Sequence, residues 1–114
     1  MSSTAKSVLA LVAASAALFV AQPSLAVDAA AAEKLARQEG CLRCHGIDRP
    51  KDGPAYKQIA EKNRGKPDAE ARLIKHLSSG TKVKFEDGHE EEHKIPKTKD
   101  ADQIKNLIQW VLSL

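Results

Sequence analysis

The sequence predicts a small all-α domain of about four short helices, with one long irregular segment before the last of them. Apolar residues recur at helical spacing in several stretches, and residues suited to capping helices stand beside them. No alternating run is long enough to predict a convincing strand. Outside the N-terminal apolar run the aromatic residues are few: Tyr56, Phe85 and Trp110. A chain of this size has a marginal core, so we expect something other than side chains to help fill it.

The first 26 residues have the pattern of a secretory signal peptide. A positive charge precedes an apolar run over residues 8–21, and Ser24 and Ala26 have the spacing of small residues that signal peptidase accepts. The run is shorter than the roughly 20 residues that a membrane-spanning helix needs, and no stop-transfer charge cluster follows it. We therefore predict that residues 1–26 are cleaved and that residues 27–114 are exported without stable membrane insertion. An uncleaved N-terminal anchor is the alternative.

The overall charge is nearly balanced. The sequence has 18 Lys and Arg residues against 15 Asp and Glu residues, a formal net charge of +3. That excess is too small to indicate binding to nucleic acid, and we expect none.

The first predicted helix ends directly before a cysteine motif. Residues 28–39 are rich in helix formers, and Gly40 is placed to end the helix. The next residues, "CLRCHG", contain the C-x-x-C-H signature of c-type haem attachment. Thioethers from Cys41 and Cys44 can hold the two vinyl-derived carbons of a haem edge, and His45 can then reach the iron as proximal ligand.

Two other kinds of site use paired cysteines at this spacing. A thioredoxin-like redox disulfide belongs near a βαβ pattern, which the sequence lacks. A four-cysteine zinc site would need two more cysteines than the two present. Export, spacing and small size agree on covalent haem, so we predict one haem c with its iron.

Two further helices are predicted after this motif. The loop over residues 46–54 is punctuated by Pro and Gly, and a short helix over residues 55–63 follows it. Residues 69–79 form the next predicted helix, which Asp68 can cap and Gly80 can end. Apolar residues at helical spacing define the inward faces of these two helices: Tyr56, Ile59, Ala60, Leu73, Ile74 and Leu77.

The last predicted helix begins after Asp100. Gln103 stands three residues further on, at the spacing of a capping box. Apolar residues then recur at helical spacing to the C-terminus: Ile104, Leu107, Ile108 and Val111. Residues 81–99, between the third and last helices, are predicted to be irregular, with a tight turn at residues 86–88.

With these elements in place, residues 27–114 resemble a bacterial class I cytochrome c over nearly their whole length. A helix ending in "GCLRCHG", a "GPAY" turn and a closing helix ending in "QWVLSL" carry the resemblance. It implies the class I cytochrome c fold, in which the first and last helices cross, and we expect Trp110 to be a core aromatic. It also implies that the carbonyl of Pro54 accepts a hydrogen bond from Nδ1–H of His45, which orients that ring.

The sequence departs from this family at the sixth iron ligand. The family usually supplies a methionine from the irregular segment, whereas the only methionine in this sequence is Met1, which signal cleavage would remove. His93 stands nearly at the methionine's place relative to Trp110, with a proline shortly after it. We therefore predict His93 as the distal ligand opposite His45. The alternatives are an open sixth site or one of three other side chains: His89, His76 or Lys94.

The string "HEEEH", from His89 to His93, also fits the H-E-x-x-H pattern of zinc proteases. That site needs both histidines on one helix, but Gly88 precedes the string and Pro96 disfavours helix just after it. We expect no zinc at these histidines. His89 is expected to be exposed beside the turn, His76 to be an edge or surface imidazole, and the three glutamates to form a solvated face.

Ligation by two histidines predicts electron transfer rather than catalysis. Imidazole favours ferric iron more than a thioether does, and two nitrogen ligands leave no site for O₂ or peroxide. We therefore predict a periplasmic electron carrier, not an enzyme, that acts as a monomer and exchanges electrons with redox partner proteins. The alternative is a haem-based sensor or binder of NO, CO or O₂, with an open or weakly held sixth site.

Overall fold

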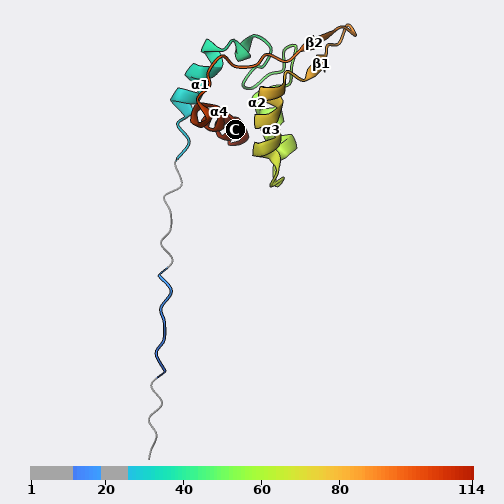
Figure 1. Ribbon diagram of the computed structural model, residues 1–114. Coiled ribbons are helices and arrows are strands. Elements are labelled where there is room, and N and C mark those ends of the chain that lie inside the picture. Colours follow the sequence, from blue (N-terminus) through green and yellow to red (C-terminus); the bar gives the residue numbers. More distant parts are fainter. Residues whose placement is uncertain (1–11, 19–25) are drawn as a thin grey trace, which may run out of the picture.

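The computed structural model describes residues 12–18 and 26–114 (Figure 1). Most of the predicted signal peptide, with Met1 and Ser24, therefore lies outside the described residues. Residues 12–18 are exposed and form neither helix nor strand. Within the described ranges, no helix is long and apolar enough to cross a membrane. The cleavage of residues 1–26 stays a prediction.

The described domain contains the predicted helices, close to their predicted bounds. In chain order the elements are α1 (Ala29–Gln38), the 3₁₀ turn η1 (Cys41–Arg43), α2 (Tyr56–Asn63), α3 (Ala69–Ser79), β1 (Lys82–Lys84), β2 (Glu90–Glu92) and α4 (Ala101–Leu112). The predicted helical class is confirmed, with a small two-stranded sheet added to it.

The core forms where α4 packs against the three other α-helices. α4 contacts α1, α2 and α3, and Figure 1 shows it lying between α1 on one side and α2 and α3 on the other. Leu107 of α4 is the most enclosed large side chain, and Trp110 is buried beside it. Leu35 and Ala36 of α1 belong to the same cluster. The predicted crossing of the first and last helices and the core role of Trp110 are thus confirmed.

The ends of α1 and α4 follow the sequence signals. Asp28 caps α1, where its Oδ1 accepts from the N–H of Ala31 at 3.0 Å. The chain leaves α1 through Gly40, whose φ of 74° lies in the left-handed region that glycine adopts without strain. Asp100 caps α4 by accepting from the N–H groups of Asp102 and Gln103.

The cap predicted for α3 differs in detail. Asp68 stands directly before the helix but makes no capping hydrogen bond, because its own backbone is already helical, with ψ of −1°. An extended N-cap conformation is what turns the side chain toward the free N–H groups. The Asp68 carboxylate instead accepts from Nε of Arg72 at 3.3 Å. Gly80 ends the helix in the left-handed conformation, as predicted.

The segment predicted to be irregular contains a β-hairpin, so the expectation of no strand was wrong. β1 and β2 pair antiparallel, with Lys82 opposite Glu92 and Lys84 opposite Glu90. Glutamate and lysine are depleted in strands, so composition hid the pairing, while opposite charges across the strands stabilise it. The predicted turn at residues 86–88 is confirmed, and the N–H of Gly88 donates to the carbonyl of Phe85 at 3.0 Å. In Figure 1 the hairpin extends away from the helices.

Candidate haem site

A large cavity opens beside the cysteine motif. Its volume is about 920 Å³, toward the upper end of the roughly 300–1,000 Å³ typical of ligand pockets. One part of the wall is formed by η1 and the turn before α2. The rest is formed by one side each of α2, α3 and α4, and by the hairpin with the residues that follow it. Residues predicted from the sequence for haem binding all lie on it: Cys41, Cys44, His45, Pro54 and His93.

The cysteine motif forms one tight turn at the C-terminal end of α1. The N–H groups of Cys44 and His45 both donate to the carbonyl of Cys41, at 3.2 and 3.0 Å. Cys41 and Cys44 form no disulfide in the described domain, and both are half-buried. Burial is the main cause that raises the pKa of the Cys41 thiol. The turn therefore presents two unpaired thiols and one imidazole to the same cavity.

The His45 ring is fixed by its neighbours. Its Nδ1 lies 2.7 Å from the carbonyl oxygen of Pro54. Since a carbonyl can only accept, Nδ1 carries the proton and Nε2 keeps its lone pair. A Cβ at Gly53 would lie 2.8 Å from Cε1 of His45, so only glycine lets the chain pass so close to the ring. The ring of Tyr56 stacks against that of His45, with centroids 5.4 Å apart.

His93 lies near His45 on the cavity wall, and its Nδ1 likewise donates a hydrogen bond to a backbone carbonyl. Its Nδ1 is 3.0 Å from the carbonyl oxygen of Lys94, so Nε2 again keeps its lone pair. Its backbone N–H donates to the carbonyl of Thr81 at 2.8 Å, which ties the residue to the start of the hairpin. Burial lowers the pKa of His93, and His76 and His45 lower it further. The neutral, ligating form is therefore favoured.

The spacing of these two rings suits a single metal ion between them. The ring centroids of His45 and His93 are 5.9 Å apart. Two imidazoles on opposite sides of one metal, with metal–nitrogen bonds of about 2 Å, place their centroids roughly 6 Å apart. The paired thiols, the two available Nε2 atoms and the size of the cavity all fit a covalently attached haem.

His76 lies on the cavity wall, where the sequence predicted an edge or surface imidazole. It is half-buried, and its ring centroid is 4.3 Å from that of His93. Burial lowers its pKa, and nearby His45 lowers it further. His76 stands three residues after Leu73, so both lie on one face of α3, and both line the cavity. This spacing was the sequence signal that could have placed His76 at the site. Helical spacing shows which residues share a face, but not that the face lines a cofactor cavity.

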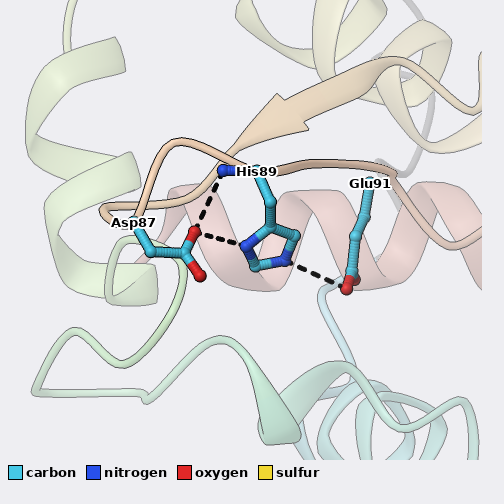
Figure 2. A network of polar contacts seen from close by, with 3 residues as sticks. All are labelled: Asp87, His89 and Glu91. Carbon is cyan, nitrogen blue, oxygen red and sulfur yellow. Dashed lines mark hydrogen bonds and ion pairs between the residues drawn. The ribbon is translucent and has the colours of Figure 1, made fainter.

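His89 lies at the tip of the hairpin rather than on the cavity wall (Figure 2). Its Nδ1 contacts the carboxylate of Asp87, and its Nε2 lies 3.2 Å from Oε1 of Glu91. Its ring stacks on Phe85 with centroids 4.3 Å apart. The hydrogen bond to Asp87 is the main cause that raises the pKa of His89, and Glu91 adds to it. The expected exposure of His89 is confirmed.

The zinc-protease pattern is not realised. Glu90–Glu92 is a strand, so His89 and His93 stand at its two ends, roughly 13 Å apart along an extended chain. A shared metal would require one helical turn between them. The three glutamates are exposed, as predicted.

Comparison with known proteins identifies the family. The model of the Cytochrome c family matches residues 29–114. The chain belongs to the cytochrome c family. Cytochrome c-551 of Pseudomonas aeruginosa is 36% identical over 84 residues, which cover 71% of this cytochrome and 74% of that protein. Cytochrome c-552 of Hydrogenobacter thermophilus is 36% identical over 98 residues, which cover 85% of this cytochrome and 95% of that protein.

Solved structures agree with this assignment. The class 1 cytochrome MtoD from Sideroxydans lithotrophicus ES-1 superposes with a TM-score of 0.74 at 60% identity and covers 77% of this cytochrome and 97% of that chain. Wild-type cytochrome c552 of Nitrosomonas europaea gives a TM-score of 0.59 at 27% identity and covers 72% of this cytochrome and 98% of that chain. The protein therefore has the class I cytochrome c fold and carries one covalent haem c with its iron. Its relatives are small cytochromes c, which are electron carriers rather than enzymes.

Proposed function

We propose that this cytochrome is a periplasmic, monomeric electron carrier whose iron is bound by His45 and His93. The pairing of the two imidazoles carries the proposal. Their ring centroids are 5.9 Å apart across the cavity, and each Nδ1 is engaged by a backbone carbonyl, that of Pro54 or of Lys94. Both Nε2 lone pairs are thereby left for a metal ion.

The chain's own residues attach and orient the cofactor. Haem c supplies a one-electron iron couple when bound. Cys41 and Cys44 hold the haem edge through thioethers, and the η1 turn fixes the spacing of their sulfur atoms. Pro54 orients the His45 ring, and Gly53 leaves room for it. Basic side chains at the α2–α3 end of the cavity suit the haem carboxylates: Lys62, Lys66 and Arg72.

Two imidazole ligands favour electron transfer over ligand binding. They leave no open coordination position, and they stabilise ferric iron more than a His/Met pair does. No observation in the described domain favours the sensor alternative. Residues 1–26 are proposed as the signal peptide that directs export, and redox partner proteins in the periplasm are the proposed electron donors and acceptors.

The proposal is tested on the purified holoprotein by ferric absorption and EPR spectra and by a redox titration. We expect a low-spin ferric signal of two nitrogen ligands, no sulfur–iron band at roughly 695 nm, and reversible one-electron reduction. Carbon monoxide should bind the reduced protein slowly or not at all. A high-spin ferric signal, or rapid and tight CO binding, would contradict ligation by two histidines and favour a sensor.

Export has its own test. The protein recovered from the periplasmic fraction should have the mass of residues 27–114 plus one haem. A haem-bearing protein that keeps residues 1–26 and sediments with the membrane would instead establish the uncleaved anchor.

A further inference from the structure

We propose that His76 is a second distal ligand built into the cavity, which takes the iron when His93 leaves it. The inference rests on the proposed function, because it assumes that His93 is the resident ligand. It assigns a chemical role to the histidine on α3, which the proposed function leaves unused.

The placement of His76 gives it access to the same coordination position. It shares the cavity wall with His45 and His93, and its ring centroid is 4.3 Å from that of His93. That separation is too short for the two rings to bind one iron from opposite sides, which needs roughly 6 Å. A haem iron offers one ligand position on each face, so His76 and His93 are alternatives for the same position.

The His76 ring also forms no hydrogen bond within the described domain. Within residues 26–114, histidine ring nitrogens form hydrogen bonds at His45, His89 and His93, and none of these bonds involves His76. Water or a metal can therefore use either nitrogen. A half-buried imidazole beside a proposed haem iron, with no protein partner to hold its lone pairs, is available to bind iron.

The two histidines are held by elements of different stability. His76 lies within α3, which packs against α4 in the core. His93 follows β2, all three residues of which are exposed, and its backbone N–H is tied to the carbonyl of Thr81. Segments with few buried contacts open locally more often than packed helices do. Opening of the hairpin would withdraw His93 and leave His76 in the cavity.

The exchange is a simple ligand substitution. One nitrogen–iron bond, to His93, breaks, and one, to His76, forms, with both imidazoles neutral and donating a lone pair. No proton or electron is transferred. A small ligand therefore meets an occupied position even while the hairpin is open, which suits an electron carrier.

Four holoproteins test the proposal: wild type, His76→Ala, His93→Ala and the double variant. We expect His76→Ala to have the wild-type EPR spectrum. We expect His93→Ala to stay low-spin with two nitrogen ligands but with shifted g values, because the new imidazole has another orientation. The double variant should be high-spin and bind CO rapidly. Lys75→Ala, beside His76 on α3 but exposed and off the cavity wall, is the control and should match wild type.

Other outcomes separate the two claims. A high-spin spectrum in the single variant His93→Ala would overturn the proposal that His76 is a second distal ligand. It would still support His93 as the resident ligand. A low-spin double variant would also overturn the proposal for His76, because a side chain such as Lys94 would then be the substitute. An unchanged spectrum in His93→Ala would contradict the proposed function itself. If the alanine variants do not fold, His76→Phe and His93→Phe fill the same space without a metal-binding atom.

Discussion

The orientation of the His45 ring depends on the absence of a side chain at Gly53. A Cβ there would lie 2.8 Å from Cε1 and 3.0 Å from Nδ1 of His45, and the ring cannot retreat without losing its bond to Pro54. We predict that Gly53→Ala destabilises the holoprotein by about 1–3 kcal/mol, the usual cost of overpacking, and shifts the EPR g values. Urea unfolding and EPR measure the two effects.

Gly65→Ala is the control for this variant. No heavy atom lies within 4 Å of a Cβ at Gly65, although its φ of 76° strains any other residue. It should cost about 1 kcal/mol of backbone strain and leave the iron spectrum unchanged. Equal spectral changes in both variants would mean that Gly53 acts through general stability and not through the ring.

The stability of the hairpin tip depends on pH through the protonation of His89. Its pKa is raised by Asp87 and then by Glu91, above the ordinary value of about 6.5. Protonated His89 therefore stabilises the folded hairpin fully below the unfolded pKa, and this contribution is lost as the pH rises through the raised folded pKa. We expect amide exchange at Phe85, which donates to the carbonyl of His89, to accelerate over that range beyond the intrinsic rate.

His89→Ala should abolish this additional pH dependence. NMR titration of the His89 ring checks the direction of the shift. A titration midpoint below the ordinary histidine value would refute the interpretation that the Asp87 contact holds the proton.

Sequence reasoning at the residue scale succeeded where chemistry and spacing coincide. The motif from Cys41 to His45, and the place of His93 relative to Trp110, pointed to residues that the structure puts on the wall of one cavity. His76 was predicted to be an edge or surface imidazole, because a histidine beside an apolar helical face ordinarily lies at a surface edge. Only the tertiary structure shows that this face of α3 lines the cavity.

At the scale of elements, the helices were predictable and the hairpin was not. Caps and apolar periodicity fixed the bounds of α1, α2, α3 and α4. The strands β1 and β2 are three residues each and mostly charged, so composition did not indicate them, and the alternation that includes Val83 and Phe85 is too short to predict a strand. The register places lysine opposite glutamate at both ends of the paired segment, an arrangement that favours pairing of the strands.

This register allows a charge-swap experiment. Lys84 stands opposite Glu90, so Lys84→Glu places like charges across the strands, and each such pair is worth roughly 0.2–1 kcal/mol. We expect faster hydrogen exchange in the hairpin. If His76 substitutes for His93, the population with shifted g values should also grow. The swap Lys84→Glu with Glu90→Lys should restore both measurements, and failure to do so would show that the charge pairing does not hold the hairpin.

At the scale of the whole molecule, the haem completes a core that the side chains leave unfinished. The buried cluster of the described domain is small, and a cavity of about 920 Å³ lies beside it. Tyr56 links the two, because its ring stacks on His45 and meets Trp110 edge-on, with centroids 5.7 Å apart. Without haem, this cavity would have to collapse or fill with water, and a domain of this size has little stability to spare.

We therefore predict that the chain with Cys41→Ala and Cys44→Ala, purified without haem, is largely unfolded. Far-UV circular dichroism should show a loss of most helical signal, and urea should produce no cooperative transition. The holoprotein with His76→Ala is the control, since it keeps the haem and should unfold cooperatively. If the haem-free chain unfolds cooperatively near the midpoint of the holoprotein, the helices alone form a sufficient core, and the haem is not required to complete it.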